Sequence, residues 1–152
     1  MPDEALRAAF AEAVAQARAG LREGGIPIGA VLVENGAVLG GGHNRRVQDG
    51  DPIAHGEMDC LRRAGRQKSY RGLTLYTTLS PCMMCTGTII QFKIGRLVIG
   101  ENRTFGGNEE LLRSRGVDVT VLDDARCIAM MERFQRDHPD VWAEDIGEEP
   151  AA

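Results

Sequence analysis

The sequence predicts a three-layer α/β/α sandwich with a five-stranded mixed sheet, and two observations lead to this fold class. The first is an opening pair of short strands joined by Asn35-Gly36, a dipeptide typical of tight hairpin turns. The second is the alternation of strand and helix patterns after that hairpin, which is typical of sheets covered by helices. The chain has 152 residues, 43% of them hydrophobic, which suits one domain with a full core over residues 1–152.

The first predicted element is an amphipathic helix, because apolar residues recur at helical spacing from Leu6 to Leu21. It is expected to end near Gly20. Aliphatic residues over 28–34 and 37–41 flank the turn and form the predicted hairpin. The chain therefore enters the sheet through an antiparallel pair.

Three consecutive glycines from Gly40 to Gly42 are interpreted as a flexible strand end, because no lysine of a phosphate-binding loop follows them. The polar segment 45–52 is expected to be a loop. The later elements are predicted from the same patterns, with β-branched runs typical of strands and longer amphipathic runs typical of helices. They are strands at 73–79, 96–100 and 117–122, and helices at 55–64, 81–92 (Pro81 in its first turn), 108–115 and from a cap at Asp123-Asp124 to Pro139.

Charge and composition narrow the range of partners. The net charge of −4 argues against nucleic acid, since phosphate binding relies on a basic surface. No apolar run is long enough to cross a bilayer, so no membrane partner is expected. The N-terminus has no secretory signal, and a cytoplasmic protein is expected. In a reducing compartment, a close pair among the four cysteines indicates a metal site rather than a disulfide.

The central feature is an H-x-E motif containing His55 and Glu57, followed by a P-C-x-x-C motif containing Cys82 and Cys85. A catalytic zinc ion takes three protein ligands and keeps one position for water, and the histidine and two cysteines supply three. Because two thiolates nearly neutralise the dication, the water needs a nearby base, and Glu57 is expected to be that base. The combined pattern is typical of zinc-dependent deaminases, with one Zn²⁺ per chain.

The alternative for this motif is a closed structural zinc site with a fourth protein ligand, for which Cys60 is the nearest candidate. Both ligand groups lie at predicted helix N-termini, where the helix dipole favours thiolate over thiol. Cys60 lies five residues after His55, so its side chain is expected to point elsewhere. Cys60 and Cys127 are therefore interpreted as small buried hydrophobes.

Other candidate residues have simpler interpretations. Glu57 taken alone is an ordinary first-turn glutamate, and only its spacing from the three ligands favours a catalytic role. His138 is expected to be solvated at an exposed helix end. His43 is expected to form local hydrogen bonds rather than bind metal.

Beyond these motifs, the chain resembles the fungal-type cytosine deaminases, a branch of the cytidine-deaminase-like superfamily. The resemblance extends from about Ala11 to Glu148. The zinc motif alone indicates only the superfamily, whereas the Glu-Asp-Ile-Gly-Glu sequence close after Trp142 is specific to this branch. The matching stretches are 23–29, 42–44, 55–57, 75–82, 84–87, 98–102 and 142–148.

The resemblance implies a set of substrate contacts. The Asn44 amide would hydrogen-bond the pyrimidine edge, since an amide both donates and accepts. The backbone N–H of Gly56 would hold the base carbonyl, and the Ser80 backbone and the Asp145 carboxylate would contact the exocyclic amine. Aromatic and aliphatic walls would enclose the ring. These walls are Ile28, Leu79, Phe105 and Trp142.

The resemblance also implies a reaction, the hydrolytic deamination of cytosine to uracil and ammonia in pyrimidine salvage. Glu57 would shuttle protons from the zinc-activated water to the ring and to the leaving amine. A C-terminal segment at about 139–149 is expected to act as a lid, because it is terminal and carries Trp142 and Asp145. A homodimer is a further implication.

The sequence departs from the family at three places, so alternatives stay open. Ala143 stands where the family has a second aromatic residue, and 51–54 and 58–59 also differ. The alternatives are a deaminase of another free base or nucleoside, such as guanine, a pterin or an isocytosine-like base, a tRNA adenosine deaminase, and a non-catalytic zinc-stabilised binding module. Asn44 and Asp145 favour a small free base.

Overall fold

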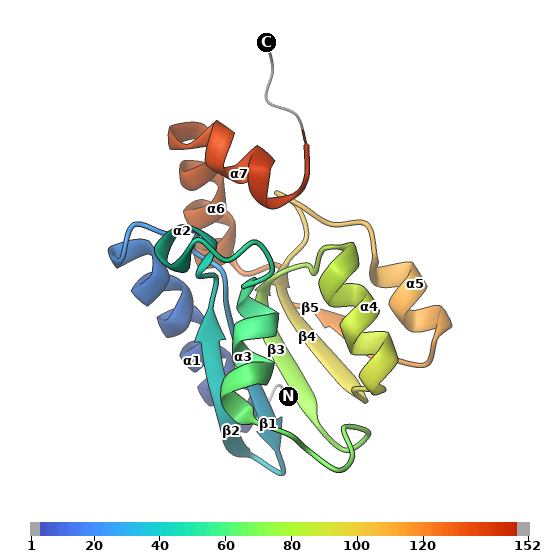
Figure 1. The fold of residues 1–152 in the computed structure, drawn as a ribbon. Helices are drawn as coiled ribbons and strands as arrows, with labels where there is room; N and C mark the ends of the chain where they lie inside the picture. The colour runs from blue at the N-terminus through green and yellow to red at the C-terminus, as the bar shows by residue number, and fades with distance from the viewer. Residues whose placement is uncertain (1–3, 149–152) are drawn as a thin grey trace.

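The computed structural model describes residues 4–148 and contains one five-stranded mixed sheet in the order β2-β1-β3-β4-β5 (Figure 1). β1 (Gly29–Glu34) pairs antiparallel with β2 (Ala37–His43) and with β3 (Thr74–Leu79). β4 (Arg96–Glu101) and β5 (Asp118–Val121) continue the sheet in parallel from β3. The predicted mixed sheet with an opening hairpin is confirmed.

The two faces of the sheet carry separate hydrophobic clusters, because successive strand residues point to opposite sides. Ala30 and Leu32 belong to one cluster, while Val31 and Val33 belong to the other. The first cluster lies beneath helices α3 (Gly56–Ala64), α4 (Met83–Phe92) and α5 (Glu109–Ser114), and the second beneath α1 (Glu4–Arg22) and α6 (Ala125–Asp137). Figure 1 shows α3 and α4 lying in front of the sheet. The three layers match the predicted sandwich. None of the helices in residues 4–148 has the length and apolar character needed to span a membrane.

Local signals in the sequence account for two element boundaries. Asn35 and Gly36 have φ angles of 48° and 80°, as the predicted tight hairpin turn requires. Asp124 caps α6, its carboxylate accepting hydrogen bonds from the backbone N–H groups of Arg126 and Cys127. Both predictions of turn and cap are confirmed.

Apart from shifts of one or two residues at element ends, such as α1 ending at Arg22 rather than near Gly20, four features differ from the sequence-based expectation. The expected loop at 45–52 contains a short helix, α2 (Arg46–Asp49), which an Arg45–Asp49 ion pair of 2.8 Å supports. α4 begins after Cys82, so Pro81 precedes the helix instead of occupying its first turn. The segment after Pro139 is also helical, α7 (Pro139–Asp145), because proline suits the first position of a new helix.

The fourth difference is that the glycine run belongs to β2 and is not a flexible strand end. Helix α3 lies directly across this strand. A Cβ atom at Gly40 would lie 2.6 Å from Ala64 Cα, and one at Gly42 would lie 2.5 Å from Asp59 Oδ2 and 2.7 Å from Cys60 N. The glycines therefore allow the close approach of α3 to the sheet, which sets the position of the helix that begins beside His55.

We expect the Gly42→Ala substitution to destabilise the fold by about 1–3 kcal/mol, because the added methyl group overpacks the contact between β2 and α3. Gly72→Ala is the matched control, since no atom lies within 4 Å of the added Cβ at that position. Denaturant-induced unfolding of the two variants measures the difference. Equal midpoints for both variants would contradict the packing argument.

Candidate active site

The N-terminal ends of α3 and α4 bring the predicted metal ligands together. His55 is the residue before α3 and Cys82 the residue before α4, and both have extended backbone conformations. Cys82 Sγ lies 3.4 Å from His55 Nδ1, and Cys85 Sγ lies 3.8 Å from the same nitrogen. The three residues are close in space although 27 positions separate His55 from Cys82 along the chain.

The three donor atoms fit a zinc ion. They lie within 4.8 Å of one another, and tetrahedral zinc with bonds of about 2.3 Å to sulfur and 2.0–2.1 Å to nitrogen separates its ligands by about 3.5–3.8 Å. Hydrogen bonds from Cys85 and His55 lower the pKa of Cys82 to about 4, which favours the thiolate that a metal binds. Within the described residues, this is the only group of three or more such side chains.

The two remaining cysteines are unsuited to metal binding. Cys60 and Cys127 are both buried and free, and burial raises the pKa of each thiol to about 12. The Cys60 thiol lies 3.6 Å from the carbonyl oxygen of Gly40, away from the three donor atoms. A fourth protein ligand from Cys60 is therefore not supported, which leaves a coordination position for water.

Glu57 lies in the first turn of α3, and its side chain lines the same cavity as His55 and Cys82. The residue is only 4% exposed. Burial, together with the nearby Cys82 thiolate, raises the pKa of its carboxyl group to about 7. A buried carboxylate beside a metal site is positioned to accept and return a proton.

Asp145 contacts the metal site in a way that the sequence did not predict. Its Oδ1 atom lies 3.3 Å from His55 Nε2, while His55 Nδ1 faces the two sulfurs. A carboxylate on the far nitrogen fixes the orientation and tautomer of a metal-binding histidine. The same Oδ1 atom accepts a 3.0 Å hydrogen bond from Asn44 Nδ2. Asp145 thus joins a metal ligand to a predicted substrate-binding residue.

A narrow cavity opens beside these groups, and most of the predicted site residues line it. Phe105 and Trp142 form one wall, packed edge to face with ring centroids 5.6 Å apart. Ile146 also lines the cavity and was not predicted, since an isoleucine in an acidic tail carries no chemical signal. The lining residues are Ile28, His55, Glu57, Leu79, Ser80, Cys82, Phe105, Trp142, Asp145 and Ile146.

Three predicted residues lie behind this lining. Asn44 is fully buried and reaches the site through Asp145. Gly56 begins α3 against the backbone of Ile28, where a Cβ atom would lie 2.9 Å from the carbonyl oxygen. Cys85 is buried among the metal ligands. Each therefore borders the site, although none of the three lines the cavity.

Ser80 is held by two residues that the sequence did not single out. Its backbone N–H donates a 3.0 Å hydrogen bond to the carbonyl of Glu101, and its hydroxyl donates to the Glu109 carboxylate. The Ser80 carbonyl is therefore the backbone group left to face a ligand. Both glutamates are far from Ser80 in sequence, so only the fold brings them to it.

A metal site with three protein ligands, an open position and an adjacent buried carboxylate defines the class of zinc-dependent hydrolases that activate water. The comparisons make this class more specific. Residues 3–101 match the family of the cytidine and deoxycytidylate deaminase zinc-binding region. The chain belongs to this deaminase family, and the cluster of His55, Cys82 and Cys85 fits one zinc ion per chain.

Individual relatives agree with this assignment. The chain is 50% identical over 139 residues to a cytosine deaminase of Candida albicans, covering 90% of this chain and 93% of that protein. A structure from a study of tRNA:A34 deaminases superposes with a TM-score of 0.66 at 33% identity, covering 76% of this chain and 98% of that one. A guanine deaminase from Nitrosomonas europaea has a TM-score of 0.74 at 24% identity, covering 85% and 84%, and supports the fold alone.

Proposed function

We propose that this chain hydrolyses free cytosine to uracil and ammonia. The observation that carries the proposal is the buried pair of Asn44 and Asp145, which places a hydrogen-bonding amide and a carboxylate beside the metal ligands. This pair suits the edge of a small base, which presents both donors and acceptors. The 50% identity to a cytosine deaminase over nearly the full length of both chains supports the same substrate.

The contacts to the base are proposed from the groups that the fold leaves unpaired. Asn44 uses its Oδ1 atom to accept from the backbone N–H of Arg46, so its second Nδ2 hydrogen is available for the base carbonyl. The N–H of Gly56 adds a second donor to that carbonyl. The Ser80 carbonyl and the Asp145 carboxylate accept from the exocyclic amine. The apolar walls enclose the ring and exclude water.

The proposed mechanism assigns proton transfer to Glu57. Zinc, when bound, lowers the pKa of a water molecule and so supplies a nucleophile at neutral pH. The Glu57 carboxylate accepts a proton from this water as C4 is attacked, and delivers the proton to ring N3. It then carries the second proton, from the hydroxyl group that the water has formed on C4, to the amine nitrogen, so that the C4 carbonyl forms, the C–N bond breaks and ammonia leaves. Asp145 holds the His55 ring in place throughout.

We also propose that α7 acts as a lid within the expected segment at about 139–149, of which Glu149 lies outside the described residues. The cavity has a volume of about 10 Å³, room for about one water molecule and too little for a pyrimidine. α7 contributes Trp142 and Asp145 to this cavity, and an exposed ion pair of 3.1 Å joins Arg46 to Glu144. Outward movement of α7 would admit the base, and its return would complete the site.

A homodimer, a cytoplasmic location and a role in pyrimidine salvage complete the proposal. Helix α4 exposes large apolar side chains at its two ends, Met83 (62%) and Phe92 (42%). Exposed apolar side chains that lie close together are typical of protein interfaces. Light scattering on the purified protein would give twice the chain mass for a homodimer, whereas the mass of one chain would contradict it.

Ammonia release from a panel of substrates tests the proposed function. We expect cytosine to be deaminated at least about 100-fold more efficiently than guanine or cytidine, because α7 must move outward to admit any base and can return less fully over a second ring or a ribose than over a single pyrimidine ring. A tRNA anticodon stem-loop containing adenosine serves as the nucleic-acid alternative. Preferred turnover of guanine, cytidine or the RNA would overturn the proposal while leaving the deaminase family assignment intact.

A further inference from the structure

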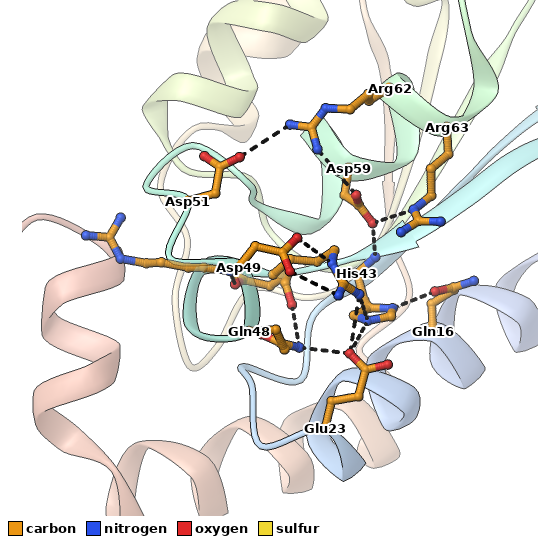
Figure 2. Close-up of polar contacts among 12 residues, drawn as sticks. Gln16, Glu23, His43, Gln48, Asp49, Asp51, Asp59, Arg62 and Arg63 are labelled. Atoms are coloured by element: carbon orange, nitrogen blue, oxygen red, sulfur yellow. Dashed lines mark hydrogen bonds and ion pairs between the residues drawn. The ribbon is translucent and has the colours of Figure 1, made fainter.

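A polar network joins the end of β2 to α1 and α3, and the mechanism above does not use its central residue (Figure 2). Its centre is His43, which is 7% exposed. The ring Nδ1 atom lies 2.7 Å from Gln16 Oε1 on α1. The ring Nε2 atom lies 2.9 Å from Glu23 Oε1, just after α1. Both ring nitrogens are thus held from one side of the sheet.

The backbone of the same residue is held from the other side. The N–H of His43 donates a 3.1 Å hydrogen bond to Asp59 Oδ2, and Asp59 is only 1% exposed. Arg63 Nε donates a further 3.1 Å hydrogen bond to that carboxylate oxygen. Asp59 lies on α3 two residues after Glu57, so it ties the end of β2 to the helix that carries the catalytic carboxylate.

The network continues to Asn44, the proposed base-binding residue. Asn44 directly follows the last residue of β2, and the two side chains diverge, so the His43 ring meets α1 while the Asn44 side chain reaches Asp145. Gln48 Nε2 lies 3.2 Å from both the Asn44 carbonyl oxygen and Glu23 Oε1. Glu23 Oε1 also lies 3.3 Å from Arg45 Nη1, so Glu23 contacts both His43 and Arg45, the residues before and after Asn44.

The hydrogen bonds of Asn44 leave little tolerance for a change in its position. One Nδ2 hydrogen is given to Asp145, and Oδ1 accepts from the N–H of Arg46. Only the second Nδ2 hydrogen is left for a base, and a hydrogen bond weakens steeply when its distance or angle departs from the optimum. A small shift of the backbone at 43–44 is therefore expected to cost base affinity.

We propose that His43 is a positioning residue for substrate binding, which acts through Asn44 without touching the base or the metal. The proposal rests on the proposed cytosine deaminase function. The contacts of His43 with Gln16, Glu23 and Asp59 together hold the Asn44 amide in position relative to the start of α3. Loss of the ring contacts should weaken base binding more than it slows the chemical step.

The His43→Phe substitution tests this proposal, because it keeps a ring of similar size and removes both ring nitrogens. We expect KM for cytosine to rise about 10-fold, which corresponds to the loss of about one hydrogen bond, with kcat within about threefold of wild type. Zinc content should stay at that of wild type. His43→Asn retains a polar atom near Gln16 and should restore part of the lost affinity. Arg62→Ala is the control, since this half-exposed side chain has only long contacts of 3.6 and 3.8 Å to Asp59 and Asp51.

A double-mutant cycle with Asn44→Ala separates positioning from general destabilisation. If His43 acts through Asn44, His43→Phe should change kcat/KM by less than about twofold in the Asn44→Ala background. An unchanged KM for His43→Phe, or an equal loss of kcat/KM in both backgrounds, would overturn the proposal. Should His43→Phe fail to fold, Glu23→Ala replaces it in the same cycle, because its half-exposed side chain can be removed without opening a core cavity. Absence of turnover in the wild type would instead refute the proposed function.

Discussion

The Glu57→Gln variant is expected to bind one zinc ion per chain and to lose about 100- to 10,000-fold of its kcat on cytosine. Glutamine has nearly the same shape as glutamate but cannot accept the proton from water or return it to the ring and the amine. The three metal ligands are unchanged, and the variant should fold as the wild type does. Steady-state ammonia release, with metal analysis on the same samples, measures both quantities.

A matched control makes this result specific. Glu144→Gln makes the same chemical change at an exposed position of α7, where the carboxylate only pairs with Arg46. Exposed ion pairs contribute little, so its turnover should remain near that of wild type. Residual activity of Glu57→Gln within tenfold of wild type would show that another group moves the protons.

The Asp145→Ala variant is expected to lose both zinc affinity and activity. Its carboxylate orients His55 through Nε2 and fixes Asn44 through Nδ2, so its removal leaves two buried donors without their partner. Removal of such an orienting group typically lowers metal affinity or activity by about 10- to 100-fold. Because Asp145 also contacts the base in the proposed complex, we expect kcat/KM to fall by at least about 100-fold.

Competition with a chelator tests the metal effect separately from turnover. Zinc should dissociate faster from Asp145→Ala than from wild type, while Glu144→Ala on the same helix should match wild type. The rate of zinc dissociation from Asp145→Asn should lie between those of wild type and Asp145→Ala, because the asparagine amide oxygen still accepts a hydrogen bond from the His55 ring. Identical zinc dissociation from wild type and Asp145→Ala would show that the aspartate contacts the substrate alone.

The metal centre could be predicted from sequence because its signal is local. Cys82 and Cys85 are three positions apart on adjoining turns, and His55 and Glu57 share a second short motif, so spacing alone indicates which atoms converge. The sheet was predictable for a similar reason, since the hairpin turn and the alternating apolar patterns act over a few residues. The Asp124 cap belongs to the same group of local signals.

The remaining features depend on contacts between distant parts of the chain. The pairing of His55 with Asp145 joins residues 90 positions apart, and nothing near either residue indicates it. The glycine run was interpreted as flexible because its true role, the close approach of α3, involves Gly42 and Asp59 on separate elements. α7 was missed as a helix because Pro139 ends one helix and starts another, and a proline signals both.

The most direct test of the central claim is the conversion of cytosine by the purified protein with one zinc ion per chain. Chromatography of the products should show uracil and ammonia appearing in equal amounts, and removal of zinc by a chelator should abolish both until zinc is restored. Zinc-loaded, folded protein that leaves cytosine unchanged would contradict the account of the substrate.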